Sequence, residues 1–576
     1  MDYLRRAAGL LVIVLSVACR EAGGQPTRIA TPDARLIADA AALINRTFAA
    51  PSGPGTSSSE YQNLQRLYSN ANGSPRWVDA AGRPTLVARE ALDLLCSAET
   101  DGLDPDDYDA SRTVERAAAL EGSPSPSDVA AFDVALSLGT LRYLHDLHAG
   151  RIDPATLGIR LERPTDHPDY VALLEGALAR GRIAPEAAEL TPPSIQYRAL
   201  RELLARYRAL ASNPTLKPPP LPAEPLRPGD AFKGLPALQR LLAAFGDLPV
   251  DAAASAVPET YEGALVEAVR HFQRRHGLTA DGVVGRATAR ALAVPPSARV
   301  NQIELSLERL RWLPRLAGRR LIAINIPMFR LWAWDANPPA GAPTLGMGVI
   351  VGRALDTQTP MLIEEMRSVL FRPAWNVPLS ITQKEIVPRL GRDPGYLARE
   401  DMELVAGPGD GAPVVPATPE NLMQLKHGAL RVRQRPGPKN SLGLVKFDFP
   451  NDESVYMHGT PARELFSRAR RDFSHGCVRV EDPVALAVWV LGGPPAWSRE
   501  DVLDAMHAEG SHRVELARPL QVVLFYMTAL VSPEEGTAWF ADDIYRQDAR
   551  LDAALAAESH QRRTRPVSTW TKFDAG

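Results

Sequence analysis

Two short motifs combine histidine, glycine and cysteine: His458-Gly459-Thr460 and, after a mixed segment, Ser474-His475-Gly476-Cys477-Val478-Arg479. Cys477 is one of three cysteines in a chain of 576 residues. The thiolate is the nucleophilic form of cysteine, and an ordinary thiol, with a pKa of about 8.5, is mostly protonated at neutral pH. Because a nearby imidazole can accept that proton, the motifs predict a Cys–His pair suited to acyl transfer.

The residues next to Cys477 support a catalytic interpretation over a buried structural cysteine. Gly476 lets the backbone pack close to the sulfur, and the N–H groups of Gly476 and Cys477 are candidates for an oxyanion hole. The neighbours of Cys477 are polar and basic, namely Arg470, Arg471, Ser474, His475 and Arg479, and cationic surroundings lower the pKa of a thiol.

Either histidine is a candidate general base. We favour His458, in its own glycine turn, with a backbone carbonyl near Gly459 orienting the imidazole. His475 is the rival, because residues two apart in an extended segment face the same side. Otherwise His475 forms a wall of the site or supports the oxyanion.

Four further side chains are candidates for shaping the site or binding substrate. Ser474 is expected to hydrogen-bond His475 or the substrate. Arg479 either binds a substrate carboxylate through its planar guanidinium or pairs with Glu481 or Asp482.

Tyr456 and Trp375 either line the groove or belong to the core. His458 and His475 lack the spacing of a zinc site, so neither a metal nor another cofactor is predicted.

The sequence pattern predicts an α+β multidomain protein. In residues 61–217, apolar residues recur at three- and four-residue steps, which predicts a helical domain. A proline-rich linker separates it from a compact helical unit, residues 229–294. In residues 318–532, β-branched runs bounded by glycine and proline predict a β-rich domain, either a sandwich or a related mixed fold.

The composition changes within that β-rich domain. Residues 378–430 are predicted to form an inserted lid with a helix over residues 381–390, capped by Ser380 or Thr382, and a glycine-rich tip at residues 407–411. Residues 533–576 are predicted to be a helix and tail.

The N-terminal 19 residues have the pattern of a secretory signal: two arginines, a short apolar run and a small residue before Cys19. Either Cys19 is lipidated and anchors the protein, or the chain is cut near Ala18. Residues 20–60 are predicted to contain a flexible tether. The near-neutral net charge of −3 does not indicate a basic surface that binds nucleic acids.

The two motifs resemble the signature of the L,D-transpeptidases, cysteine enzymes that cross-link bacterial peptidoglycan. Six other stretches resemble large multidomain members of Gram-negative bacteria: Asp101-Gly102-Leu103, Leu141-Arg142-Tyr143, Gly150-Arg151-Ile152-Asp153-Pro154, Glu308-Arg309-Leu310-Arg311-Trp312, Trp375-Asn376-Val377-Pro378 and residues 434–443. Residues 272–288 resemble the small three-helix peptidoglycan-binding domain. Gly459 departs from the pattern, because similar large enzymes often have Asp there.

This resemblance implies a helical scaffold domain, a peptidoglycan-binding-like domain and a YkuD-type catalytic domain with a lid. It implies a periplasmic enzyme, open to carbapenem attack, whose partners are peptidoglycan stem peptides and glycan strands. Cys477 would form a thioester with a tetrapeptide stem, release its terminal D-alanine and pass the acyl group to an amine. Two alternatives remain: an L,D-carboxypeptidase that uses water, and a non-catalytic anchor that binds through residues 229–294, which the intact Cys–His motifs disfavour.

Overall fold

The computed structural model describes residues 34–49, 58–161, 168–218, 224–254, 257–315, 318–338, 341–493 and 495–564. The signal segment, with Cys19, lies outside the described residues. The chain divides into two compact units: the first is drawn from Met1–Ile152, Thr165–Pro192 and Ala553–Gly576, and the second from Asp153–Pro164 and Pro193–Asp552. No described helix combines the length and the apolar character needed to span a bilayer.

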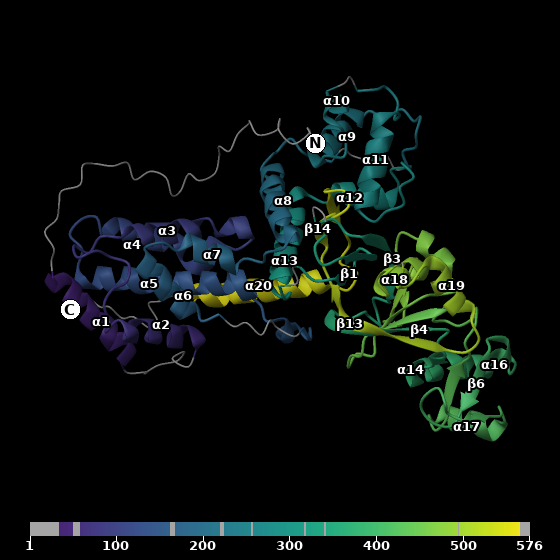
Figure 1. Ribbon diagram of the computed structural model, residues 1–576. Coiled ribbons are helices and arrows are strands. Elements are labelled where there is room, and N and C mark those ends of the chain that lie inside the picture. The colour runs from purple at the N-terminus through teal and green to yellow at the C-terminus, as the bar shows by residue number, and fades with distance from the viewer. Residues whose placement is uncertain are drawn as a thin grey trace. The chain divides into compact units, whose positions relative to one another are not determined.

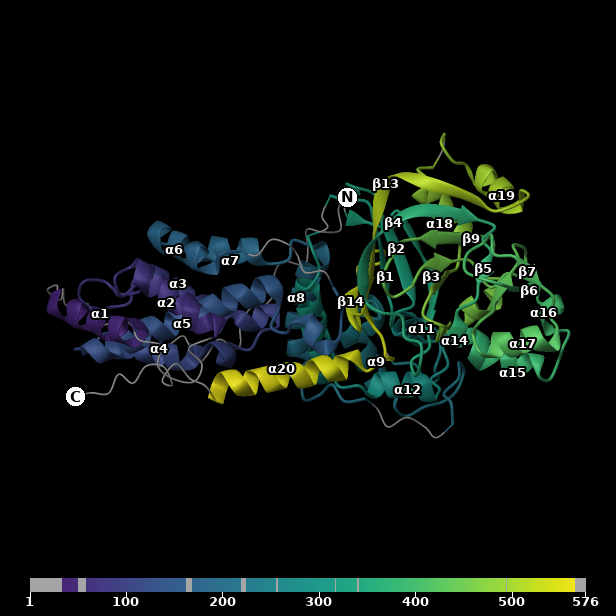
Figure 2. The ribbon, with the colours of Figure 1, turned by 90° about the horizontal axis from the view of Figure 1, so that it is seen from below.

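The first unit is helical and is organised around α5 (Pro126–Ala149). Ser125 and Asp128 form a capping box at its start. Apolar residues occur on all faces of α5, and nearly all are buried, as expected for a central helix. Helices packed against it include α1 (Ala34–Ala49), α2 (Ser59–Asn70), α3 (Leu86–Cys96), α4 (Ala110–Ala119), α6 (Tyr170–Arg180) and α7 (Ala184–Leu190), which surround it in Figure 2.

The predicted tether is wrong over residues 34–49, which form helix α1. Its apolar residues recur every four positions and are buried in the core of the first unit: Leu36, Ala40, Ile44 and Phe48. That spacing places all four on one helix face. Burial of this face stabilises a helix here, although the sequence on either side has the composition of a tether.

The C-terminal part of the last described helix, α20 (Gln547–Thr564), belongs to the first unit, where an ion pair holds it. Arg562 donates to Asp146 on α5 at 2.6 Å, and both side chains are buried. Burial by itself would raise the pKa of Asp146, but Arg562 and the hydrogen bond with His145 hold that pKa well below its ordinary value.

The second unit contains a mixed sheet that closes on itself. Its strand order is β11 (Asp472–Ser474), β3 (Leu345–Gly352), β12 (Val478–Val480), β10 (Met457–His458), β9 (Val445–Asp448), β4 (Leu362–Phe371), β13 (His512–Phe525), β1 (Leu321–Asn325) and β2 (Arg330–Trp334). Because β2 also pairs with β3, the strands from β3 to β2 in this order form a closed ring, and β11 pairs with β3 outside that ring. The pairs β1–β13, β10–β12 and β11–β3 are parallel, and the other neighbours are antiparallel.

Helices surround this sheet. After β12 come α18 (Pro483–Val490) and α19 (Arg499–His507), which pack on each other (Figure 1). Helices α8 (Ile195–Ala211) and α13 (Pro296–Arg311) share one core with β1, β13 and the hairpin β14 (Ala529–Val531)–β15 (Ala538–Phe540). The predicted helical domain therefore differs from the first unit at α8, whose apolar face is buried against the second unit.

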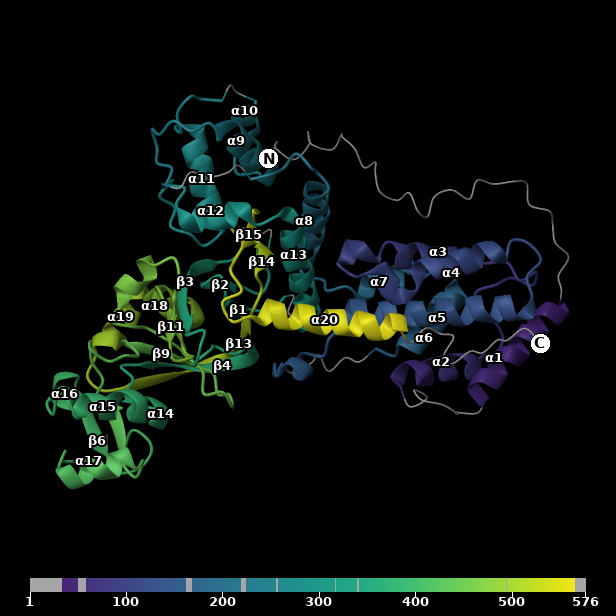
Figure 3. The same ribbon diagram turned by 180° about the vertical axis from the view of Figure 1, so that it is seen from behind.

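The compact unit predicted at residues 229–294 contains α9 (Leu235–Phe245), the single turn α10 (Val250–Ala253), α11 (Ala264–Arg275) and α12 (Arg286–Ala293), as Figure 3 shows. These helices have their own core, centred on Leu238, Leu242, Val269 and Phe272.

The predicted lid is a folded subdomain. We call residues 375–434 the inserted subdomain. It has a four-stranded sheet, in the order β5 (Trp375–Asn376), β8 (Arg431–Gln434), β6 (Met402–Val405) and β7 (Val414–Val415), with helices α14 (Leu379–Ile381), α15 (Val387–Leu390), α16 (Tyr396–Arg399) and α17 (Pro419–Lys426). Ile386, Leu404, Leu425 and Val432 are among the residues of its separate core.

The helix predicted over residues 381–390 contains a wide turn. It starts after Pro378, not after Ser380 or Thr382, and Thr382–Ile386 form a π-helical turn, η5. Pro388 lacks an N–H group and its ring clashes with the carbonyl four residues earlier, so a regular α-helix is disfavoured at this point.

We expect Arg562→Ala to lower the free energy of unfolding by about 3–5 kcal/mol, because it leaves a buried carboxylate without its cation. Urea denaturation followed by circular dichroism measures this. Because the folded pKa of Asp146 is depressed, the contribution is present above a pH of about 4 and is lost as pH falls further. Arg89→Ala, in an exposed pair with Glu121, is the control and should change little. An equal loss of unfolding free energy in both variants would contradict a stabilising role for the buried Arg562–Asp146 pair.

Candidate active site

Strand pairing brings the two motifs together. In parallel register, Met457 lies opposite Val478 and His458 opposite Arg479. Met457 and Val478 are fully buried in the core. Because side chains alternate along a strand, His458 and Arg479 lie on the other face, together with Cys477. Lys446 of β9, opposite His458, is on that face as well.

The Cys477 thiol is half-buried at the start of β12. The Sγ atom lies 3.8 Å from the Ser454 carbonyl oxygen, and the Tyr456 hydroxyl hydrogen-bonds the sulfur. The Val478 N–H donates to the Tyr456 carbonyl at 3.0 Å, which continues the β10–β12 ladder up to the cysteine. The sulfur is therefore held beside the end of β10.

Burial raises the pKa of Cys477 above its ordinary value, although the Tyr456 hydrogen bonds, Lys446 and Arg479 act in the opposite direction. The predicted net lowering of the thiol pKa is therefore wrong, although Arg479 does act in that direction. Arg470 pairs with Asp472 at 2.6 Å. Arg471 donates to the backbone carbonyls of Phe329 and Val349 at 3.0 and 3.2 Å. These two cations are close to Cys477 in sequence but are engaged elsewhere.

His458 is a buried, neutral imidazole. Burial lowers its pKa to about 3, and the Arg479 charge acts in the same direction. Its Nδ1 lies 2.5 Å from the Gly459 carbonyl oxygen, which is the orienting carbonyl expected from the sequence. The Leu442 carbonyl is a second backbone acceptor at this ring. Since a carbonyl only accepts hydrogen bonds, the Nδ1 that faces Gly459 carries the proton, and the lone pair of the neutral ring is then on Nε2.

The glycine turn after His458 is closely packed. Gly443 has a φ of +65°, and a Cβ atom there would lie 2.8 Å from the Gly459 carbonyl carbon. Gly443 is a site-shaping residue that the motif analysis missed; only the Gly459 turn was singled out.

His475 points to the inserted subdomain. Its Nε2 lies 2.5 Å from Oε1 of Glu385 in η5. Gly476 has a φ of +117°, so the segment is not extended. The alternation argument that made His475 a rival base therefore does not apply. Glu385 itself was missed, because 90 residues separate it from His475 in the sequence.

Ser474 and Gly476 differ from expectation. The Ser474 hydroxyl donates to the Cys477 carbonyl at 2.6 Å and accepts from the Gly476 N–H at 3.2 Å, so it bonds the loop itself and not His475. The Gly476 N–H is thus already engaged, contrary to its predicted oxyanion role. Within the described parts of the chain, the Cys477 N–H has no hydrogen-bond acceptor.

Arg479 does not form either ion pair that the sequence left open. Glu481 accepts from the Gly348 N–H at 2.7 Å, and Asp482 caps α18 by accepting from the Ala485 N–H. The Arg479 Nε is buried without a partner among the described residues, and burial lowers the pKa of this guanidinium.

The two aromatic candidates are half-buried, and Trp375 also packs against the core of the inserted subdomain. Trp375 hydrogen-bonds the Tyr456 hydroxyl. The Tyr456 ring lies 5.7 Å from the His458 ring, and the Lys446 amine lies 4.2 Å from the Tyr456 centroid. Lys446 was missed because the alternating pattern of its strand indicates only that its side chain points away from the core.

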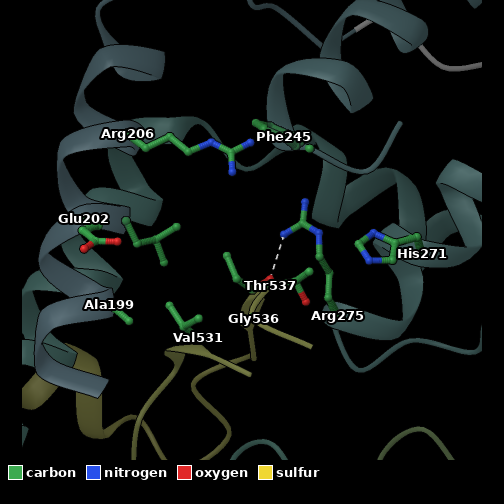
Figure 4. Close-up of a pocket in the computed structure, with 12 residues that line it drawn as sticks. Ala199, Glu202, Arg206, Phe245, His271, Arg275, Val531, Gly536 and Thr537 are labelled. Carbon is green, nitrogen blue, oxygen red and sulfur yellow. Dashed lines mark hydrogen bonds between the residues drawn. The ribbon is translucent and has the colours of Figure 1, made fainter. Parts of the chain in front are cut away.

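A cavity of about 270 Å³ lies elsewhere in the second unit, between α8, α9, α11 and the β14–β15 hairpin. Figure 4 shows Arg206, Phe245 and Arg275 around it. None of the predicted site residues lines it, and Arg275 is already paired with Asp247. We therefore place the chemistry at Cys477 and not in this cavity.

We expect the alkylation rate of Cys477 by iodoacetamide to keep rising with pH beyond about 8.5, because the thiol pKa is raised above its ordinary value. Peptide-level mass spectrometry separates Cys477 from Cys96, which serves as the internal reference. A rate that levels off below pH 7 would instead indicate a thiolate–imidazolium pair.

Three family models match the chain. Residues 319–502 match an L,D-transpeptidase catalytic domain, residues 233–292 a "Putative peptidoglycan binding domain", and residues 62–204 a scaffold domain. The chain therefore contains an L,D-transpeptidase catalytic domain together with a peptidoglycan-binding and a scaffold domain.

A curated "Putative L,D-transpeptidase" of Haemophilus influenzae is 28% identical over 264 residues, which are 45% of this chain. The match spans about half, 51%, of that relative's length. The crystal structure of an L,D-transpeptidase (residues 123–326) from Xylanimonas cellulosilytica is matched over 53% of this chain and 100% of that chain, at 16% identity and a TM-score of 0.17.

Proposed function

We propose that this chain, which carries an L,D-transpeptidase catalytic domain, is a cysteine-dependent transpeptidase that cross-links peptidoglycan stem peptides through a thioester. One observation carries the proposal: within that domain, strand pairing places the Cys477 thiol on the same face as a buried, neutral His458 with Nδ1 protonated. A neutral imidazole with its lone pair on Nε2 is the form that accepts a proton there.

In the first half of the reaction, Cys477 Sγ attacks the carbonyl carbon of the penultimate residue of a tetrapeptide stem. The thiol proton passes to His458 Nε2 as the S–C bond forms, because the resting thiol is protonated. The C–N bond to D-alanine then breaks, and His458 returns the proton to the leaving amine. The Cys477 N–H is available to stabilise the oxyanion.

In the second half, an acceptor amine attacks the thioester carbonyl and gives one proton to His458. The C–S bond breaks, the thiolate regains that proton, and a new amide bond joins the two stems. The amine nitrogen must be neutral to attack, so the neutral imidazole serves as the base in both halves.

Arg479 is proposed to bind a carboxylate of the donor stem. Its guanidinium has no carboxylate partner in the described residues, and a buried cation is stabilised by an anion. The helices of residues 229–294 are proposed to contact glycan strands. Export to the periplasm and a lipid anchor on Cys19 remain predictions from the N-terminal sequence.

The second candidate is an L,D-carboxypeptidase, in which water attacks the same thioester. It is retained because Cys477 and His458 serve both reactions. Product analysis with and without an acceptor stem separates the two: a cross-linked dimer indicates transfer, and free tripeptide alone indicates hydrolysis.

We expect Cys477→Ser to fold normally and to form no acyl-enzyme, because a hydroxyl has a far higher pKa and the same imidazole does not activate it. Intact-mass spectrometry with a tetrapeptide donor detects the intermediate. Cys96→Ser, on α3 of the first unit, is the matched control and should keep activity. Cross-linking by Cys477→Ser at a near wild-type rate would refute the mechanism.

The tip of the inserted subdomain generates a second prediction. Residues 407–411 connect β6 and β7, and Asp410 holds the tip by accepting from Asn376 at 2.7 Å. We expect deletion of residues 407–411 to leave acylation of Cys477 by a small carbapenem largely intact and to reduce stem-to-stem transfer sharply. The reason is that the tip covers a large substrate and not the thiol. Intact-mass spectrometry reports the first step and muropeptide analysis the second.

Asp410→Ala removes the Asn376 contact but leaves the hydrogen bond from Arg433 to the Asp410 carbonyl, so it should give a smaller loss of transfer. If the deletion abolishes both steps in a folded protein, the tip belongs to the catalytic core.

A further inference from the structure

The loop that carries Cys477 is held from one side by the segment between β3 and β4. The Arg353 N–H and the Thr357 hydroxyl donate to the Ser474 carbonyl at 3.0 and 3.1 Å. The Thr359 hydroxyl donates to the Gly476 carbonyl at 2.7 Å. These contacts fix the backbone of residues 474–476 but not the ring of His475.

From the other side, the inserted subdomain reaches the same loop with a carboxylate. Glu385 Oε1 lies 2.5 Å from His475 Nε2, and each side chain is only 29% exposed. A charge-assisted bond between two partly desolvated groups is stronger and more directional than one at the open surface. It fixes the imidazole two residues before the nucleophile.

Two arginines hold the carboxylate in place. Arg353 Nη2 lies 3.6 Å from Oε1, and Arg389 Nη2 lies 3.7 Å from Oε2. Arg353 belongs to the segment that binds the Ser474 carbonyl, and Arg389 belongs to the inserted subdomain. The cluster therefore contains groups from both sides of the contact.

The helix turn that carries Glu385 is adapted to this contact. Glu385 belongs to the π-helical turn η5, and such turns occur frequently at functional sites. The next residue, Ile386, is buried in the core of the inserted subdomain. The position of Glu385 is thus set by the packing of the whole subdomain.

We propose that Glu385 is a positioning residue for the catalytic loop, acting through His475. The inserted subdomain then does more than cover substrate: its placement fixes the loop that presents the Cys477 thiol and N–H. The inference rests on the proposed function, since the loop is the one that would form the thioester.

The experiment compares Glu385→Ala, Glu385→Gln, His475→Ala and the Glu385→Ala/His475→Ala double variant. A small carbapenem acylates Cys477 in single-turnover runs followed by intact-mass spectrometry, and thermal unfolding is measured on each protein. Lys384→Ala, an exposed neighbour in the same turn, is the matched control.

We expect Glu385→Ala and His475→Ala each to slow the maximal acylation rate about tenfold or more, the scale of a small misplacement at a reacting centre. The Tm and the half-saturating carbapenem concentration should be unchanged. The double variant should be no slower than the slower single variant, because both changes break one contact. Glu385→Gln keeps an oxygen acceptor and should recover part of the rate, and Lys384→Ala should match wild type.

Additive losses in the double variant, an unaffected rate in Glu385→Ala, or an equal loss in Lys384→Ala would each overturn the inference. Failure of the proposed function has a different signature: wild-type protein would show no acylation at all. In that case, iodoacetamide alkylation of Cys477 still tests the positioning role, since it requires only a presented thiol.

Discussion

The candidate site depends on the parallel pairing of β10 with β12. This short ladder places Met457 against Val478 in the core and, because side chains alternate, places His458 and Arg479 on the opposite face with Cys477. A shift of one residue would send His458 into the core and Met457 into the site. The fully buried Met457 and Val478 resist that shift, so apolar packing on one face fixes the chemistry on the other.

Burial of the same region sets the protonation states. Desolvation disfavours charge on both partners: it raises the pKa of Cys477 and lowers the pKa of His458 to about 3. The resting site is therefore a thiol and a neutral imidazole, and the proton moves only when a substrate carbonyl is attacked. A resting thiol is less open to unspecific alkylation and oxidation than a thiolate.

The inserted subdomain has its own sheet and its own core, and it contacts the catalytic loop through Glu385. A separately folded subdomain can change position as a body without losing its packing. Its single charged contact with His475 then links its position to the geometry around Cys477. The tip at residues 407–411 and the Glu385 contact are different parts of this subdomain, so substrate covering and loop positioning are separable.

The sequence by itself determined the local chemistry and the local elements. It made Cys477 and His458 the catalytic candidates and a backbone carbonyl near Gly459 the candidate that orients the imidazole, because short motifs give residue type and spacing directly. It also indicated the β-rich domain within residues 318–532 and the helices within residues 229–294, because runs of apolar and β-branched residues show which segments are buried.

Tertiary structure alone decided which partner each polar group has. Arg470 and Arg471 are near Cys477 in sequence, but Asp472 and backbone carbonyls engage them, so the expected effect on the thiol pKa is absent. The His475 ring is paired with the Glu385 carboxylate, and the Gly476 N–H donates a hydrogen bond to the Ser474 hydroxyl. Sequence distance does not predict such contacts, because charge and hydrogen bonding act over a few ångströms in space whatever the separation along the chain.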